Sequence, residues 1–458
     1  MFYIDVLKKA LQLDLWDLHY LYSKPKTLER LLLADSSGLP RRGLLLRIGV
    51  YFGHLLSCLN PRHWLSQSRV PAGVIVLFAK TNNQRESLKP IQSGLPGAYL
   101  VGSHGDYSLD WTFLLAHLFS LPFFPYTWVL FFRSTGIVRR AFHYIFDQYW
   151  LIPGFYIAVR WWFHRRKPRA LVLSNDHIWE CRVMILAARD EGVPTVYLQH
   201  ASITDEFPPL SMDVALLHGQ DALSVYEKAG PAQTQVFLLG MPRFDAFAGY
   251  RNPRSGVGGV GVCCNLFDPM ERVAQLCQTI RAAEPKCRLV LRPHPQDRRK
   301  SDWLEIAQQC QAEFSDSSQE NAFDFLQKVD VLFSGNSNIH LEAALMDVYP
   351  IYFDYACDAR LEKYSFLESG LCEYLSDLDA VPGRLKELAA HRPPVRHRAR
   401  RYCATADTEY EGRSAELACH LIEELARQGQ INLDDWQRVS GSALEAYELP
   451  GQTAEEQA

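Results

Sequence analysis

Short apolar runs that alternate with longer helix-compatible stretches constrain the fold of this chain more than any other feature. In the first half, four such runs predict buried strands, at residues 73–79, 98–102, 170–174 and 195–199. A helix-compatible stretch at 180–191 lies between the last two and is closed by Gly192 and Pro194. Because strand, helix and strand with such punctuation form a right-handed parallel unit, its repetition predicts a doubly wound α/β sheet.

The same alternation restarts after the polar, linker-like segment 249–256. Strands are predicted at 257–264, 288–292, 329–333 and 349–354, and the helices between them begin near Pro269, Ser301, Asn321 and Asn338. We therefore predict two Rossmann-like domains, at 71–248 and 256–425, that face each other across a cleft. An N-terminal helical segment at 1–70 precedes them. A long polar helix at 408–428 and a fraying acidic tail at 426–458 end the chain.

Composition excludes several classes of protein. The 48 Lys and Arg residues against 52 Asp and Glu residues give a net charge of −4 and a pI near 6.4, which disfavours a nucleic-acid binder. The eleven cysteines are scattered and contain no C-x-x-C pair, so we expect reduced thiols and a cytoplasmic protein. No spacing typical of metal ligands occurs, and no metal is expected. The charged N-terminus resembles neither a signal peptide nor a membrane span.

One region leaves two interpretations open. Residues 113–132 are almost wholly apolar, although Pro122 and Pro125 interrupt them, and residues 160–169 interleave aromatic rings with cations. This composition suits peripheral contact with the inner face of the cytoplasmic membrane through about 113–169. It equally suits a helical insert, at about 112–169, that is buried and ends in a solvated basic stretch. A transmembrane span is the least favoured interpretation.

Polar residues follow the predicted strands of the second domain, where ligands of open parallel sheets bind. Asn265 and the helix-capping Asp268 follow the first strand, and Arg292-Pro-His294-Pro follows the second. We predict that His294 carries a proton or a positive charge to a phosphate leaving group. The loop after the third strand predicts a phosphate cradle, with Glu342 one turn later on the ribose; its residues are Ser334, Gly335, Asn336, Ser337 and Asn338. The G-x-G-x-x-G pattern at 256–261 merges into a strand and does not predict dinucleotide binding.

In the first domain, acids and histidines follow three predicted strands and could supply a general base or a carboxylate nucleophile. Asp106 follows 98–102, Asp176 follows 170–174 with His177 and Glu180 nearby, and His200 follows 195–199. We favour Asp176, with Asp106 and His200 next. The sequence leaves open whether such a group acts as a base, with inversion at the reacting carbon, or as a nucleophile, with retention.

These motifs resemble the two-Rossmann glycosyltransferases of the GT-B class, over about residues 71–425. Arg292-Pro-His294-Pro resembles the HP motif and Ser334-Gly-Asn-Ser337 the serine motif of bacterial enzymes with CMP- or CDP-activated donors, namely sialyltransferases, capsule Kdo transferases and teichoic-acid glycerophosphotransferases. The resemblance implies that His294 assists departure of the nucleotide and that Ser334 and Ser337 bind phosphate. Gln199-His200 is similar to the strand-end histidine of the glycerophosphotransferases, but Ala201 replaces their glycine, and no copy of the sialyltransferase acidic motif is found.

The resemblance implies a glycosyltransferase of capsule or lipopolysaccharide assembly. Its donor would be a nucleotide sugar, preferably a CMP-activated acid such as Kdo or a sialic-type sugar, and its acceptor a glycan or lipid-linked glycan. Two alternatives stay open besides a glycerophosphotransferase. Residues 334–343 also resemble the nucleotide-binding segment of UDP-GlcNAc 2-epimerases, and a non-catalytic sugar-nucleotide-binding module would bind a donor without turnover.

Overall fold

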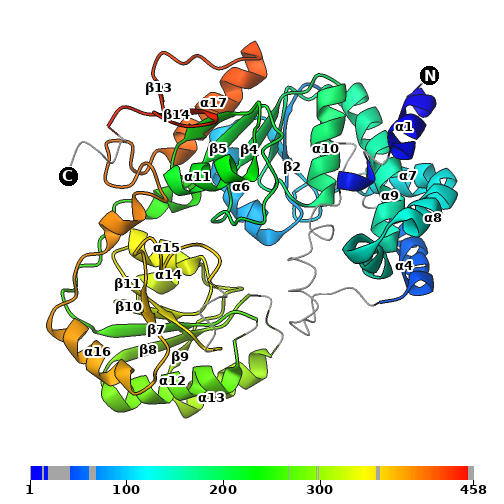
Figure 1. The fold of residues 1–458 in the computed structure, drawn as a ribbon. Helices are drawn as coiled ribbons and strands as arrows, with labels where there is room; N and C mark the ends of the chain where they lie inside the picture. The colour runs from blue at the N-terminus through cyan, green and yellow to red at the C-terminus, as the bar shows by residue number, and fades with distance from the viewer. Residues whose placement is uncertain are drawn as a thin grey trace.

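The chain folds into two α/β domains, each built on a parallel sheet with helices on both faces (Figure 1). The computed structural model describes residues 2–12, 15–18, 42–60, 69–266, 268–295, 297, 299–356 and 362–451. Parts of the predicted segment 1–70, at 13–14, 19–41 and 61–68, and the last residues of the predicted tail, 452–458, lie outside them.

The first domain contains an eight-stranded sheet in the order β13-β14-β6-β5-β4-β3-β1-β2, parallel except for the β13–β14 pair. Its strands are β1 (Ile75–Phe78), β2 (Ala98–Val101), β3 (Ala170–Leu173), β4 (Thr195–Leu198), β5 (Val214–Leu217), β6 (Gln235–Leu238), β13 (Gln437–Arg438) and β14 (Glu445–Glu448). The central strands are buried on both faces, as their unbroken apolar runs require. Helices α6 (Asn82–Gly94) and α17 (Ser414–Gln428) cover one face, and α9 (Gly136–Arg166) and α10 (Trp179–Asp190) the other.

The second domain contains a six-stranded parallel sheet in the order β12-β11-β10-β7-β8-β9. Its strands are β7 (Gly259–Cys263), β8 (Arg288–Arg292), β9 (Glu313–Phe314), β10 (Val331–Ser334), β11 (Tyr349–Phe353) and β12 (Glu373–Leu375). Its helices are α12 (Met270–Ala283), α13 (Lys300–Gln309), α14 (Ala322–Leu326), α15 (Ile339–Leu345) and α16 (Ala380–Ala390). The register pairs Ser334 with Cys263 and with Tyr352, which brings the loops after β7, β10 and β11 to one edge.

A helical extension lies at the outer end of the first domain (Figure 1). It consists of α1 (Phe2–Leu11), η1 (Trp16–Leu18), α4 (Leu44–Ser57), α7 (Asp110–Ser120), η2 (Leu121–Phe123), α8 (Phe124–Arg133) and the first half of α9. Helix α9 has a kink at Ile145 and packs against all of its neighbours through aromatic rings. The remaining elements are α11 (Gln220–Ala229), η3 (Pro242–Phe247) and η5 (Arg396–Ala399).

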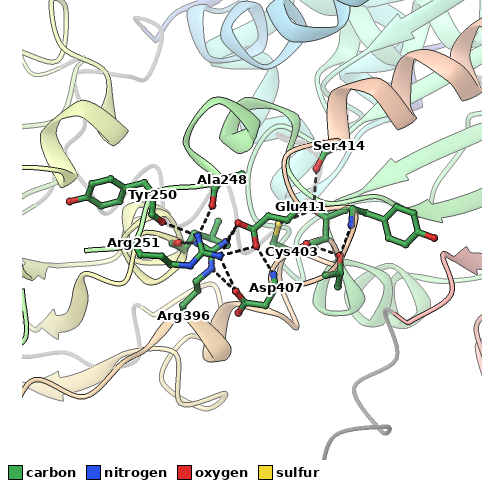
Figure 2. Close-up of polar contacts among 12 residues, drawn as sticks. Ala248, Tyr250, Arg251, Arg396, Cys403, Asp407, Glu411 and Ser414 are labelled. Carbon is green, nitrogen blue, oxygen red and sulfur yellow. Dashed lines mark hydrogen bonds and ion pairs between the residues drawn. The ribbon is translucent and has the colours of Figure 1, made fainter. Parts of the chain in front are cut away.

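The two chain segments that connect the domains are bound to each other (Figure 2). Arg251 of the outgoing segment donates to Asp407 and Glu411 of the returning segment, at 3.3 and 3.0 Å. Arg396 contacts the same two carboxylates, at 2.8 and 2.6 Å. This shared network joins the two segments where the chain passes between the domains.

The structure corrects the predicted C-terminal region. The predicted tail does not fray over its described part, because β13 and β14 extend the first sheet beside β6. Helix α17 also belongs to the first domain, and it begins at Ser414 rather than near residue 408. Asp245 explains that start, since its carboxylate accepts hydrogen bonds from the backbone N–H groups of Ser414 and Ala415, at 3.2 and 2.6 Å.

The glycine-rich pattern at 256–261 has a packing role. Its last three residues lie in β7, where a Cβ on Gly261 would come within 2.7 Å of the Phe325 ring. Glycine therefore lets α14 approach the sheet closely. The ten cysteines in the described residues are buried and free, as predicted.

Candidate functional site

The loop after β10 presents buried hydrogen-bonding atoms without protein partners. Ser334 Oγ is fully buried and has none, and neither has Asn338 Nδ2. Buried donors without acceptors are rare in folded proteins, because each costs the desolvation free energy of its group. Helix α15 has only seven residues, so anion binding here falls to these side chains and the loop backbone. These two atoms therefore have hydrogen-bonding capacity that the protein itself does not use.

Asn265 and Asp268 support this loop from the neighbouring strand β7. Asp268 accepts from the Asn265 backbone N–H at 2.7 Å, and Asn265 Nδ2 donates to the Asn336 carbonyl at 3.5 Å. A Cβ on Gly335 would lie 3.0 Å from both carboxylate oxygens of Asp268, so glycine permits their close approach. Burial raises the pKa of Asp268 to about 7.

Arg292 and His294, the two polar residues of Arg292-Pro-His294-Pro, have different surroundings. His294 follows β8 and is half-buried, and this burial lowers its pKa from the usual value, so it is neutral at pH 7. Arg292 is buried and donates to Ser315 Oγ at 2.6 Å and to the Glu320 carbonyl at 2.9 Å. These two contacts direct its guanidinium toward the segment between β9 and α14.

The first domain contacts the same loop directly. The backbone N–H and the hydroxyl of Ser202 donate to Asn338 Oδ1, at 3.1 and 2.5 Å. Arg243, which follows β6, donates to the buried carboxylate of Glu342. Glu342, predicted to hold a ribose, therefore also joins the second domain to the first.

Two histidines surround Arg243 at the strand ends of the first domain. Burial, together with the positive charge of Arg243, lowers the pKa of His200 to about 4. Burial and Arg243 lower the pKa of His218 to about 3. His218 Nε2 contacts the Gln199 carbonyl at 2.9 Å, while the Nδ1 atoms of His200 and His218 have no hydrogen-bond partner. Both imidazoles are therefore neutral at pH 7, and Arg243 is the positively charged side chain near them.

The carboxylate of Asp176 is buried and lies next to the His177 ring. Its carboxylate accepts from the Tyr226 hydroxyl at 2.5 Å and lies 3.1 Å from His177 Nδ1. Asn175 accepts from two backbone N–H groups through Oδ1, so its Nδ2 faces His177 Nε2, at 3.3 Å. This places a hydrogen on Nδ1 and a lone pair on Nε2. Asp176 can therefore orient an imidazole base, whose ring also packs on Phe207 at 4.4 Å.

Asp106 lies apart from these groups, after the edge strand β2. Arg85 and Gln92 of α6 each donate to its carboxylate at 2.7 Å, and the hydrogen bond from Gln92 and the charge of Arg85 lower its pKa. Glu180 is buried and paired with Lys80. The structure thus brings together the loop 334–338, Glu342 and the ends of β4 and β6, and it places Asp106 on the side of α6.

Three residues at the junction are not among those predicted from the sequence: Ser202, His218 and Arg243. His218 and Arg243 follow β5 and β6, two four-residue strands that are not among the predicted strands. Candidate site residues were expected only after predicted strands, so Gly240-Met-Pro-Arg243 is not among them. That turn, with glycine, proline and a cation together, is the feature that could have indicated Arg243.

A cavity of about 580 Å³ lies elsewhere, between α17 and the C-terminal hairpin. Tyr410, His420 and Trp436 are among its lining residues, and none of the predicted site residues is. We therefore place the candidate site at the domain junction.

Comparison with known proteins identifies the fold of the chain. No family model and no curated protein matches the chain. A protein from Listeria monocytogenes assigned as a UDP-N-acetylglucosamine 2-epimerase is 12% identical, with a TM-score of 0.51 over 77% of this chain and 96% of that one. The wall teichoic acid polymerase TagF is 11% identical, with a TM-score of 0.50 over 84% of this chain and 98% of that one. The chain therefore has the predicted two-domain, GT-B-like α/β fold.

Proposed function

We propose that this protein is a transferase that uses a nucleotide-activated substrate bound at the domain junction. The observation that carries the proposal is the pair of buried, unpartnered donors, Ser334 Oγ and Asn338 Nδ2, in a loop that the first domain also contacts. An anion with several acceptor oxygens, such as a phosphate, satisfies such donors. The nucleotide then binds to the second domain, with Glu342 on its ribose.

We favour a nucleoside diphosphate over the CMP-linked acidic sugar that the motifs suggest. Arg243 and His200 lie at the strand ends of the first domain, near the phosphate loop of the second, so donors from both domains can hold two phosphates. One neighbour in fold supports this choice through its name, since it is assigned as a UDP-N-acetylglucosamine 2-epimerase. The name of the other, a wall teichoic acid polymerase, supports a role in the assembly of a cell-surface polymer.

The proposed reaction assigns a task to each group. An acceptor hydroxyl displaces the Asn175 amide from His177 Nε2 and gives this nitrogen its proton, and Asp176 orients the ring and stabilises the imidazolium. The deprotonated oxygen attacks the activated group, and the bond to the nucleotide phosphate breaks with its electron pair on the phosphate. Arg243, Ser334 and the N–H of His294 stabilise the charge that develops there.

Nucleotide binding and turnover test the proposal separately. Calorimetry with UDP, CDP and CMP should give a Kd far below about 1 mM for at least one diphosphate and weaker binding of CMP. Incubation with UDP-GlcNAc, CDP-glycerol and a CMP-sialic acid should then release nucleotide when an oligosaccharide or lipid-linked acceptor is added. Absence of binding by every nucleotide would contradict the site itself.

The same incubation distinguishes the alternatives. An epimerase would convert the sugar of UDP-GlcNAc without any acceptor, which proton NMR of the sugar detects. A non-catalytic module would bind the nucleotide and leave every donor intact. Either result would replace the transferase proposal while retaining the binding site.

A further inference from the structure

Most exposed apolar side chains gather on one surface of the helical extension. Nine of the thirteen large apolar side chains that are exposed in the described part of the chain lie there. We call them the α4–α8 surface; they are Leu45, Leu46, Phe52, Leu56, Leu59, Leu118, Leu121, Val129 and Phe132. Apolar surface concentrated in this way marks an interaction site, whereas scattered single residues do not.

Helix α4 has two distinct faces. Its inner face is anchored to α9, because Arg47 forms a buried ion pair with Asp147 at 2.6 Å and Tyr51 stacks on Trp150 at 3.7 Å. Its outer face carries Leu45 and Leu56, which are 84% and 66% exposed. With Phe52 they recur at the i, i+7 and i+11 positions of one helical stripe. The outer stripe is therefore a second apolar face of a helix that is already packed.

Helix α8 packs on the same part of α9 as α4 does. The rings of Phe52 and Phe124 both contact Trp150, with centroid distances of 6.0 and 4.6 Å. Val129 and Phe132 point outward from α8, and Phe132 is 64% exposed. Figure 1 shows both helices at the outer edge of the first domain, away from the second domain.

The segments that carry this surface are rich in cations and poor in acidic residues. Residues 42–60 and 111–146 contain no Asp or Glu, although the whole chain has a net charge of −4. Four exposed arginines flank the apolar side chains: Arg42, Arg133, Arg139 and Arg140. Apolar side chains that enter the acyl region and cations that meet phosphate headgroups are the combination that binds anionic lipid bilayers.

We propose that the α4–α8 surface binds the protein to an anionic membrane surface without crossing it. One helical segment in the described residues, Asp110–Arg133, is long and apolar enough to span a membrane. It is broken at η2, however, and Tyr51 donates to the His117 carbonyl at 2.5 Å, which ties α7 to α4. Insertion across a bilayer would remove α7 from this core.

The surface overlaps only part of the region expected from the sequence, about 113–169, and adds α4 to it. In the aromatic and basic stretch 160–169, Trp162 and Phe163 are buried in the core, and Arg160 pairs with Glu191 at 2.6 Å. These three residues serve packing, whereas Trp161 stays 39% exposed with Arg165 over its ring. Membrane contact is therefore assigned to α4 and α8, independently of the proposed activity.

Vesicle flotation of the full chain tests the proposal. The protein should float with vesicles of phosphatidylcholine and phosphatidylglycerol and float less with phosphatidylcholine alone. The triple variant Phe52→Ser, Leu56→Ser, Phe132→Ser should bind the anionic vesicles at least about tenfold more weakly, because three large apolar groups no longer enter the bilayer. The pair Arg133→Glu, Arg140→Glu should remove the preference for the anionic lipid.

Matched controls test whether vesicle binding depends on the α4–α8 surface in particular. The variant Leu304→Ser, Tyr374→Ser changes two exposed apolar residues of the second domain and should bind vesicles as the unchanged chain does. Nucleotide affinity should be the same in all of these variants, so loss of the proposed activity would not affect the result. Equal vesicle binding by the triple variant would overturn the proposal. A second result would also overturn it: the unchanged chain does not bind vesicles and is a dimer in light scattering, while the triple variant is a monomer. A second copy of the chain would then cover the surface.

Discussion

Arg243 in the first domain donates to the carboxylate of Glu342 in the second, and this ion pair joins the two halves of the candidate site. Glu342 is buried, so its charge is stabilised by a cation from the opposite domain. A nucleotide that binds near Glu342 therefore meets Arg243 as well. The pair couples ligand binding to the way in which the domains meet.

Replacement of Arg243 should weaken nucleotide binding and turnover. In Arg243→Ala we expect a loss of about ten- to a hundredfold in affinity for a nucleoside diphosphate, the scale of a charge-assisted hydrogen bond. Titration calorimetry measures it. Arg160→Ala is the matched control, because both arginine side chains are 23% exposed and ion-paired with a glutamate. Equal effects of the two substitutions would mean that Arg243 acts only on stability.

Ser334→Ala should separate ligand binding from stability. The Ser334 hydroxyl has no protein partner, so its removal should leave the Tm of the free protein unchanged or higher. Nucleotide affinity should fall by about tenfold, since a hydrogen bond to a charged group is lost. Ser315→Ala is the control, because Ser315 is also buried but accepts a hydrogen bond from Arg292 at 2.6 Å. This variant should have a lower Tm and an unchanged affinity for the nucleotide. A lower Tm with full affinity in Ser334→Ala would place the phosphate elsewhere.

The sequence predicts the parts of this molecule that depend on local pattern. Strands β1, β3, β7 and β8 are apolar runs bounded by glycine, proline or polar residues, and the prediction places each within two residues of its observed ends. The fold class follows from their alternation with helices. Ser334 and Asn338 are predicted site residues for the same reason, because they lie at or soon after the end of a strand.

Contacts between segments far apart in the sequence could not be predicted. The pairing of Glu342 with Arg243 depends on how two domains meet, which no local pattern specifies. The strand β14 contains Glu445-Ala-Tyr-Glu448, whose apolar content is low, and it is a strand because β6 offers it an edge. Burial also changes roles: Asp176 is a strand-end carboxylate in the sequence, but Tyr226 and His177 enclose it in the structure.

Asp176→Asn should abolish turnover and preserve nucleotide binding. The amide lacks the charge that holds hydrogen on His177 Nδ1 and stabilises the imidazolium, so we expect a fall in kcat of about 10²–10⁴. His177→Ala should lose as much, and the double variant should lose no more than either, because the two residues act as a unit. Asp213→Asn is the control, since Asp213 accepts from Thr195 at 2.7 Å within the same sheet. Additive losses in the double variant would contradict the pairing.

His294 should take up a proton when the nucleotide binds. Burial lowers its pKa in the free protein, and a phosphate beside it would raise the pKa again. Calorimetry near pH 6 in two buffers of different ionisation enthalpy should show this uptake, and His294→Asn should eliminate it. Turnover in that variant should fall by about 10²–10⁴, the range for losing an acid or a charge stabiliser. A loss under about threefold would remove His294 from the reaction.

Asp268→Asn should change how stability depends on pH. Burial raises the pKa of Asp268 from 3.8 to about 7. Between these values the folded protein holds a proton that the unfolded chain has released, so the carboxyl lowers stability progressively as pH rises through this window. Asparagine cannot ionise, and the Tm of the variant relative to the unchanged protein should therefore increase from pH 5 to pH 8. Asp297→Asn gives the contrast: burial raises the pKa of Asp297, but hydrogen bonds from Arg299 and Trp303 outweigh it and lower that pKa to about 2. Its carboxylate is ionised in both states above pH 5, so its Tm difference should stay constant over the same range. A constant difference for Asp268→Asn as well would mean that the carboxyl beside Gly335 is ionised in the folded protein, and that the loop 334–338 carries a negative charge where the proposed phosphate binds.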